Sequence, residues 1–171
     1  KNLVNSSGVI AADVTGVGTA RKNLAAATYG IDKAIFGYGN SGSRTGITNL
    51  VNSSGVVAAD TAGVGTAREY LAAAKYGGDK ALFAYGNTGS LSSLKNLVSN
   101  TGVVAADVTG VGTARYILAA VGYGSSGQAI FGYGYTSGNV SMTNLVGSTG
   151  TIGSDVTGVG TARNGPAAAS Y

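Results

Sequence analysis

The sequence predicts an all-β chain built from copies of one unit, and three observations support this fold class. Short segments recur at a period of 47 residues, which is typical of repeat architectures. Apolar runs of three to six residues are bounded by glycine-rich turns, as in small antiparallel sheets. Hydrophobic residues make up 44% of the chain and charged residues only 11%, a composition that argues against disorder. We expect at least about 40% strand and no helix longer than two turns.

The repeat is marked by Asn-Leu-Val, Asp, Arg and Tyr, each of which recurs in steps of 47, 47 and 48 residues. The chain holds about 3.6 copies, and the extra residue of the last step falls within Ser125–Gly127. Asn-Leu-Val begins at Asn2, Asn49, Asn96 and Asn144. We treat 1–171 as a single repeat domain whose units cover 1–20 (partial), 21–67, 68–114, 115–162 and 163–171 (partial).

The first two strands expected in a unit follow its Arg, as the second unit illustrates. Leu71–Tyr76 consists mainly of small apolar residues and ends at Gly77. Because Ala is the best helix former, a helix is the alternative here. However, helix propensity alone does not stabilise a helix in so short a segment between glycine-rich loops. Ala81–Tyr85 is a short apolar run with two aromatic residues, and Gly86 closes it.

The second half of the unit predicts a hairpin. Asn87–Leu94 is a polar loop that separates this hairpin from the preceding strand. Asn96–Val98 and Val103–Ala106 are the expected third and fourth strands, joined by the turn Ser99–Gly102. The loop Asp107–Arg115 then leads into the next unit. Four strands at about 10-residue spacing predict one small antiparallel sheet per repeat.

Composition excludes several classes of chemistry. The chain has no Cys, which excludes disulfides, thiolate nucleophiles and zinc–thiolate sites, and no His, which excludes a Ser-His-Asp relay. The net charge is +4, but the basic residues are scattered, unlike the basic patch of a nucleic-acid binder. No apolar run approaches the 18 or so residues of a membrane-spanning helix. We therefore expect a non-enzymatic protein with no cofactor, no metal, no nucleic-acid partner and no membrane insertion.

The recurring Asp and Arg are candidate structural ion pairs. They lie eight residues apart around Gly-Val-Gly-Thr-Ala. If the Asp residues were calcium ligands, one per unit would be too few for six to eight oxygens. We favour a buried or half-buried Asp–Arg pair that fixes the loop between units, with the Asp capping its turn. The candidates are Asp13, Arg21, Asp60, Arg68, Asp107, Arg115, Asp155 and Arg163.

From each Arg onward, the unit resembles a kelch repeat: an Arg-headed segment, an apolar strand ending in glycines, a variable loop and two further strands. The strand ending in glycines is Ile35–Gly39, Leu82–Gly86 and Ile130–Gly134, with a Tyr between the last two small residues. The resemblance covers essentially the whole chain and implies a kelch-like β-propeller. The segments DKAIFGYG and GVGTAR are also similar to glycine-rich repeats of bacteriophage tail-fibre and appendage proteins.

A propeller of this sequence would contain about 15 strands. Residues 1–12 would supply the last two strands of a blade, three sets of four would follow, and residues 164–171 would supply one first strand. The blade shared by the two ends would lack the Phe-Gly-Tyr-Gly strand. Three arrangements remain open: a four-bladed ring with one short blade, a longer parent chain from which this one is cut, and an oligomer in which another chain donates the missing strand.

The variable loops are the expected binding face. Core and turn positions are nearly identical between units, whereas the loops 40–47, 87–94 and 135–142 and the pair after each Arg diverge. In a kelch-like blade these segments open on the same face, and loops on a rigid scaffold commonly carry binding residues. The alternative is that nothing constrains them. The candidate binding residues are Asn40, Arg44, Tyr70, Asn87, Tyr116, Tyr135 and Asn139.

The recurring tyrosines have two interpretations. Their rings could stack on sugars, but we favour packing against a neighbouring unit, with the hydroxyl group hydrogen-bonded. They end the first strand or lie within the glycine-rich strand: Tyr29, Tyr76, Tyr123 and Tyr171, and Tyr38, Tyr85 and Tyr133.

The leading functional hypothesis is a structural or adhesive repeat module of a phage tail fibre or similar extracellular appendage. Low charge, the absence of Cys, the repetition and the resemblance support it. Its partners would be a cell-surface glycan or other subunits of the same assembly, at the virion or the extracellular surface. The alternatives are a propeller lectin that binds neutral glycans through its variable loops and an intracellular protein-interaction module of the kelch type.

Overall fold

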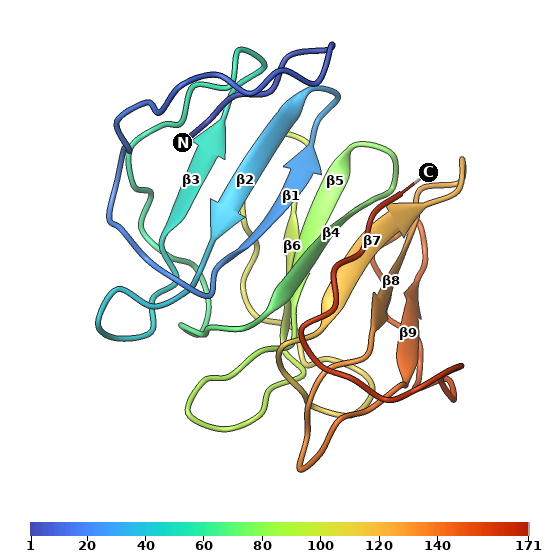
Figure 1. The fold of residues 1–171 in the computed structure, drawn as a ribbon. Helices are drawn as coiled ribbons and strands as arrows, with labels where there is room; N and C mark the ends of the chain where they lie inside the picture. The colour runs from blue at the N-terminus through green and yellow to red at the C-terminus, as the bar shows by residue number, and fades with distance from the viewer. Residues whose placement is uncertain (171) are drawn as a thin grey trace.

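The computed structural model describes residues 1–170, which form nine strands in three antiparallel sheets (Figure 1). The strands are β1 (Ala25–Tyr29), β2 (Lys33–Gly37), β3 (Thr48–Val51), β4 (Ala72–Tyr76), β5 (Lys80–Ala84), β6 (Lys95–Val98), β7 (Ala119–Tyr123), β8 (Gln128–Gly132) and β9 (Thr143–Val146). Within residues 1–170 there is no helix, and hence none long and apolar enough to cross a membrane. The all-β repeat prediction is confirmed, and the Ala-rich segment that could have been a helix is strand β4.

Each sheet contains three strands paired in chain order, with the same register in every repeat. In the second sheet, β4 and β5 are joined by the three residues Gly77–Asp79, and Tyr76 pairs with Lys80. In the third sheet the corresponding turn is one residue longer, because Tyr123 pairs with Gln128. The insertion predicted from the 48-residue step therefore lies in this turn.

The prediction of a fourth strand in each repeat is wrong. Segment 103–106 of the second repeat meets β6 at one isolated bridge, between Val98 and Val104, and a second bridge joins Lys95 to Val108. Between these bridges, Asn96 Nδ2 donates a hydrogen bond to the carbonyl oxygen of Ala105 at 2.9 Å, so a side chain replaces part of the backbone ladder. With four or five residues in each of the nine strands, regular strand covers about a quarter of the chain, less than expected.

The partial units at the two ends also contain less strand than predicted. The two strands expected in 1–12 reduce to a single bridge between Val4 and Ile10. Residues 164–170 form no strand. Tyr171 lies outside the described residues.

The hydrophobic core lies between the sheets. One cluster joins the first and second repeats, through Tyr29, Ile35 and Tyr38 on one side and Ala81, Phe83 and Val98 on the other. A second cluster joins the second and third repeats, through Tyr76, Leu82 and Tyr85 on one side and Ala129, Phe131 and Val146 on the other. Alternate residues of β5 therefore face opposite neighbours, as strand geometry requires. Each repeat therefore buries apolar side chains against its immediate neighbours, as in other repeat proteins.

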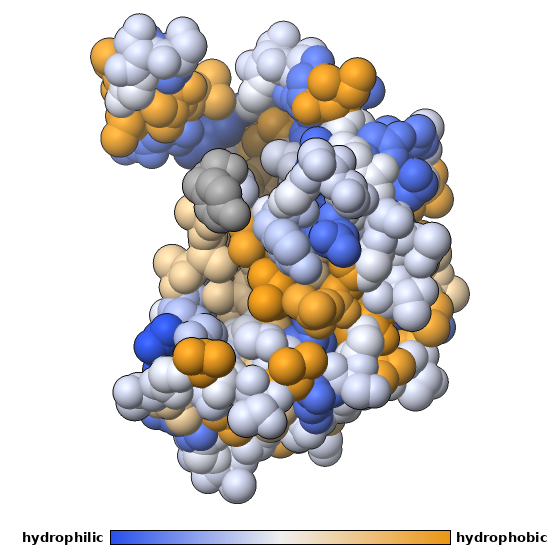
Figure 2. Space-filling model, turned by 90° about the vertical axis from the view of Figure 1, so that its right-hand side faces the viewer, coloured by the Kyte–Doolittle hydropathy of each residue, from blue (hydrophilic) through white to orange (hydrophobic). Residues whose placement is uncertain are grey.

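The outer faces of the first and third sheets are more open than the inner ones. Phe36 is 37% exposed, whereas the equivalent Phe83 and Phe131 are fully buried. On the other side, Leu145 of β9 is 46% exposed. Figure 2 shows apolar residues gathered in the middle of the side that the third sheet forms.

Candidate functional site

Two of the repeat arginines, Arg68 and Arg115, are the most deeply buried charged residues among residues 1–170. Arg68 and Arg115 have no exposed surface. Arg68 donates from Nε to the carbonyl oxygen of Tyr85 at 3.0 Å, from Nη1 to that of Thr66 at 3.2 Å, and from Nη2 to Asn96 Oδ1 at 2.7 Å. Burial lowers the pKa of Arg68 from its ordinary value, and the nearby Tyr38 and Asp107 oppose this shift. These contacts hold the start of the repeat against its second and third strands.

Three of the four repeat Asp residues lie beside the Arg of their own repeat, but the hydrogen bonds to the Asp come from other residues. Asp107 accepts from the backbone N and Oγ1 of Thr66, at 2.8 and 2.6 Å, and from Asn96 Nδ2 at 2.9 Å. Burial disfavours its ionised form, yet these hydrogen bonds outweigh that and hold the pKa of Asp107 below its ordinary value. The same pattern recurs in the repeats that begin at Arg21 and Arg115. The Nη1–Oδ1 distances are 3.9 Å for Arg21–Asp60, 3.9 Å for Arg68–Asp107 and 4.0 Å for Arg115–Asp155.

The Asp partner is the one that follows each Arg in the sequence, not the one eight residues before it. Asp13 instead accepts a hydrogen bond from Asn2 Nδ2 at 3.0 Å, and Arg163 lies over the ring of Tyr133. Within residues 1–170 neither of them belongs to an ion pair. The Asn of Asn-Leu-Val, which joins Arg68 to Asp107 through Asn96, was missed as a site residue, although its recurrence was visible in the sequence.

The arginines also connect neighbouring repeats through the tyrosines of the glycine-rich strand. The guanidinium carbon of Arg68 lies 4.2 Å from the ring centre of Tyr38 in the preceding repeat, and Arg115 lies 4.3 Å from Tyr85. The hydroxyl of Tyr38 donates to the carbonyl oxygen of Val64 at 3.0 Å. Tyr38 and Tyr85 both have φ near +63°, a left-handed conformation that favours glycine. The ring is retained here because it packs on the next repeat.

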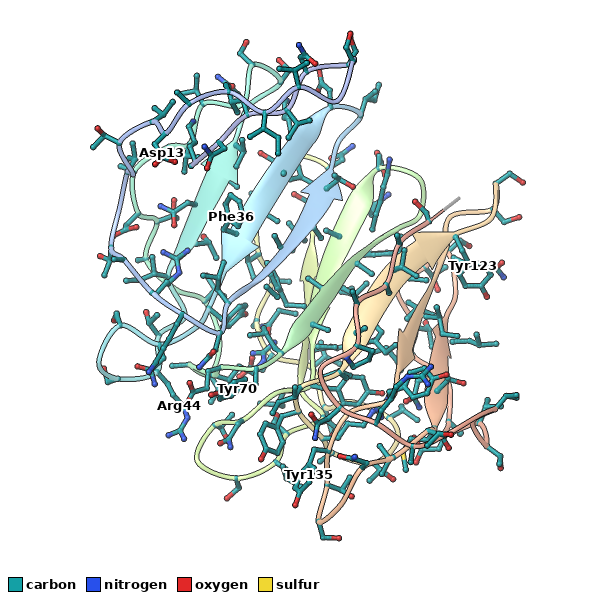
Figure 3. All side chains as sticks on the ribbon, viewed as in Figure 1. Asp13, Phe36, Arg44, Tyr70, Tyr123 and Tyr135 are labelled. Carbon is teal, nitrogen blue, oxygen red and sulfur yellow. The ribbon has the colours of Figure 1, made fainter. Side chains whose placement is uncertain are left out.

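The variable segments of each repeat meet at one edge of the molecule. Backbone hydrogen bonds in both directions join the residue after each Arg to the first residue of the variable loop: Lys22 to Asn40, Glu69 to Asn87, and Tyr116 to Tyr135. Tyr70 N donates to the carbonyl oxygen of Asn23 at 2.9 Å and thereby ties this edge to the preceding repeat. Figure 3 shows Arg44, Tyr70 and Tyr135 along this end of the sheets, whereas Asp13 and Tyr123 lie toward the other end.

Two of the candidate binding residues surround a carboxylate that sequence reasoning did not include. The side chain of Glu69 is 10% exposed and accepts from Asn23 Nδ2 at 3.0 Å and from Asn40 Nδ2 at 3.2 Å. Arg44 Nε lies 3.3 Å from Glu69 Oε1. Glu69 and Asn23 both belong to the variable pair after Arg, and this shared position was the signal that could have identified them.

Three other candidates form an aromatic row. Tyr70, Tyr116 and Tyr135 have successive ring centres 5.7 Å apart, with interplanar angles of 70° and 78°. In this edge-to-face arrangement the rings contact one another. Tyr70 keeps 36% of its surface exposed. Two further candidates have partners of their own. Asn87 forms backbone hydrogen bonds with Glu69, the residue before Tyr70. Asn139 Oδ1 accepts a hydrogen bond from Asn164 Nδ2 at 2.8 Å.

A groove of about 850 Å³ lies away from this edge. It runs along the first strands β1, β4 and β7 and is lined mainly by small side chains, among them Ala26, Ala73 and Gly122. Lys75 contributes a cationic side chain to its lining. Such a surface offers little directional chemistry.

In the part of the chain that the structure describes, no three His, Cys, Asp or Glu residues come together to hold a metal ion. Glu69 is engaged by an arginine and two amides, and the repeat Asp residues by threonines and asparagines, so each of these carboxylates has a structural partner. The arrangement can present polar and aromatic groups on a rigid edge. Comparison with protein-family models and with curated proteins finds no match to this chain.

Proposed function

We propose that this chain is a non-enzymatic structural or adhesive module of a phage tail fibre or similar extracellular appendage. The observation that carries the proposal is a repeated, buried scaffold beneath an edge that does not repeat. Arg68 and Arg115 link each repeat to the preceding one through the same contacts, while the edge above them differs from repeat to repeat. Such a scaffold can hold a constant shape while its loops vary. The similarity of DKAIFGYG and GVGTAR to repeats of phage appendage proteins supports this setting.

We further propose that the sheets are blades of a kelch-like β-propeller. In a propeller the first strands surround a central axis, and here β1, β4 and β7 lie along one groove. The Arg-headed units and their glycine-rich second strands add to this interpretation. A ring of four blades, a longer array and a strand donated by another chain all remain compatible with it. Low-resolution imaging of the parent protein would distinguish a ring from an extended array.

The adhesive role is tested by adsorption of the purified chain to host cells or cell-surface polymers. The combined Arg44→Ala, Tyr70→Ala, Tyr116→Ala and Tyr135→Ala variant removes the largest side chains of the edge. If the edge makes the contact, adsorption falls to background while circular dichroism still reports β structure. Adsorption that survives all four changes with the fold intact would place recognition elsewhere.

A lectin that binds neutral glycans is the second candidate, and the exposed ring of Tyr70 favours it. Tyr70 lies at the end of the aromatic row and is 36% exposed. The edge carries two cations, Lys22 and Arg44, and Arg44 is already paired with Glu69, so neutral sugars suit it better than polyanions. A glycan array read with wild type and with Tyr70→Ala tests this candidate. Loss of glycan binding in the variant would support a lectin. If wild type binds no glycan on the array, the structural role is the one supported.

A further inference from the structure

We infer that the variable residues of the edge form a recognition code between neighbouring repeats, which determines which repeat can lie beside which. Four positions make side-chain contacts at the first junction, and the equivalent positions define the other two. The preceding repeat supplies the second residue after Arg and the first and fifth residues of its loop, and the following repeat supplies the first residue after its Arg. We call these four residues a junction set. The sets are Asn23, Asn40, Arg44 and Glu69; Tyr70, Asn87, Leu91 and Tyr116; and Ile117, Tyr135, Asn139 and Asn164.

The residue that the following repeat supplies contacts the preceding repeat at all three junctions, but through different chemistry. Glu69 accepts from two amides and pairs with Arg44. Tyr116 packs edge-to-face on Tyr70, with ring centres 5.7 Å apart. Asn164 donates to Asn139 at 2.8 Å. One junction is therefore ionic, one aromatic and one an amide pair.

The backbone is the same at each junction, so only the side chains differ. Tyr70 N donates to the carbonyl oxygen of Asn23, Ile117 N to that of Tyr70, and Gly165 N to that of Ile117, at 2.9 to 3.0 Å. The residues at these positions share a left-handed conformation, with φ between +54° and +63°. The four positions are consequently held at equivalent places, and the identity of the side chains decides whether they fit.

Sets taken from different junctions are incompatible. A carboxylate in the place of Tyr116 would be desolvated against Tyr70, and its junction set offers one amide, that of Asn87, and no guanidinium, which is costly. A tyrosine in the place of Glu69 would leave Arg44, Asn23 and Asn40 without their acceptor.

The need for such a code follows from the rest of the interface. The stacking of arginine on tyrosine is the same at every junction, and the asparagine and aspartate contacts of Arg68 recur at Arg115, so these contacts cannot distinguish one repeat from another. Repeat proteins with interchangeable interfaces are prone to misassembly and domain swapping. The junction sets supply the missing distinction. This inference does not depend on what the edge binds.

The first test replaces one junction set by another. Asn40 already matches Asn87, so Asn23→Tyr, Arg44→Leu and Glu69→Tyr together convert the first junction set into the second. Glu69→Tyr alone creates a mismatch and should lower the folded-to-unfolded ratio about tenfold or more, measured by urea unfolding. Adding the other two substitutions should restore the ratio to within about threefold of wild type. Ile31→Tyr, at a hairpin tip that is 93% exposed, is the control and should change little.

A second series of variants, at the second junction, provides the same test if Glu69→Tyr fails to fold. Tyr116→Glu creates the opposite mismatch at the second junction, and Tyr70→Asn with Leu91→Arg should rescue it. If the substitutions act independently in both series, so that the combined variants are no more stable than the sum of single changes predicts, the code is refuted.

The second test measures repeat order directly. In the triple variant of the first junction, two junctions carry the same set, so a repeat can take either place. After refolding at high protein concentration, size-exclusion chromatography with light scattering should show a several-fold larger fraction of dimers and higher species than wild type, as expected for swapped repeats. An unchanged fraction of such species would overturn the inference.

Discussion

Replacing Arg115 by Ala should destabilise the chain far more than replacing any exposed arginine. Arg115 is fully buried and donates three hydrogen bonds, to the carbonyl oxygens of Tyr133 and Thr113 and to Asn144 Oδ1, at 2.9, 3.2 and 2.7 Å. Hydrogen bonds from a charged donor contribute about 1.5–3 kcal/mol each. The cost of desolvating the guanidinium offsets several kcal/mol of that sum. The net loss should be about 3–5 kcal/mol, which includes the acceptors left without a partner.

Thermal unfolding followed by circular dichroism measures this effect. At about 2–4 °C per kcal/mol for a chain of this size, the melting temperature of Arg115→Ala should fall by about 6–20 °C. Arg115→Lys should recover little, because an ammonium group cannot reproduce the guanidinium fork or its stacking on Tyr85. The control is Arg44→Ala, whose side chain is 36% exposed and has one ionic partner, and which should cost about 1 kcal/mol or less. Equal losses for the Arg115 and Arg44 variants would show that the buried contacts contribute nothing beyond surface charge.

Three further predictions concern Gly110, Asp107 and Tyr85. Gly110→Ala should lower the free energy of unfolding by about 1–3 kcal/mol, because its Cβ would meet the carbonyl oxygen of Ser93. The equivalent Gly16→Ala, with no atom within 4 Å of its Cβ, should be neutral in the same urea titration. Since hydrogen bonds hold the pKa of Asp107 below its ordinary value of 3.8, its contribution to stability is complete above that pH and is lost as the pH falls through the lower folded-state pKa. Melting temperatures between pH 7 and 2 should therefore fall less steeply in acid for Asp107→Asn than for wild type. Tyr85→Gly should destabilise the chain in thermal melts even though glycine relieves the left-handed backbone, and a stabilised variant would contradict the role given to the ring.

The periodic features of the fold could be predicted from the sequence because they depend on local patterns. Glycine-bounded apolar runs located β4 and β5, and the 48-residue step located the longer turn before Gln128. The fourth strand could not be predicted in the same way. Val103–Ala106 has the composition of a strand, but whether it pairs along its length depends on the Asn96 side chain, which bonds to it from the neighbouring strand. A contact of this kind is not visible in the local pattern.

The site was predictable in its location more than in its contacts. Divergence between copies identified the loops, and the structure brings them together at one edge. The partners of each side chain depend on the neighbouring repeat, which local sequence cannot reveal. Arg44 was predicted to be a binding residue, and in the structure its side chain pairs with Glu69 of the next repeat. Asn96 was considered only as the start of a strand, although it joins the buried Arg68 to Asp107.

Because each arginine stacks on a tyrosine of the preceding repeat, this contact can form only after the later repeat has been synthesised. Tyr38 receives its guanidinium from Arg68, and Tyr85 from Arg115, each 30 residues later in the sequence. During synthesis at about 5–20 residues per second, a newly made ring therefore stays uncovered for about 2–6 s before its partner exists. In that interval the nascent end presents an unfinished apolar surface, and each newly added repeat closes the surface left by the one before it. During synthesis, the packing of each repeat should therefore be completed only when the next repeat has been made.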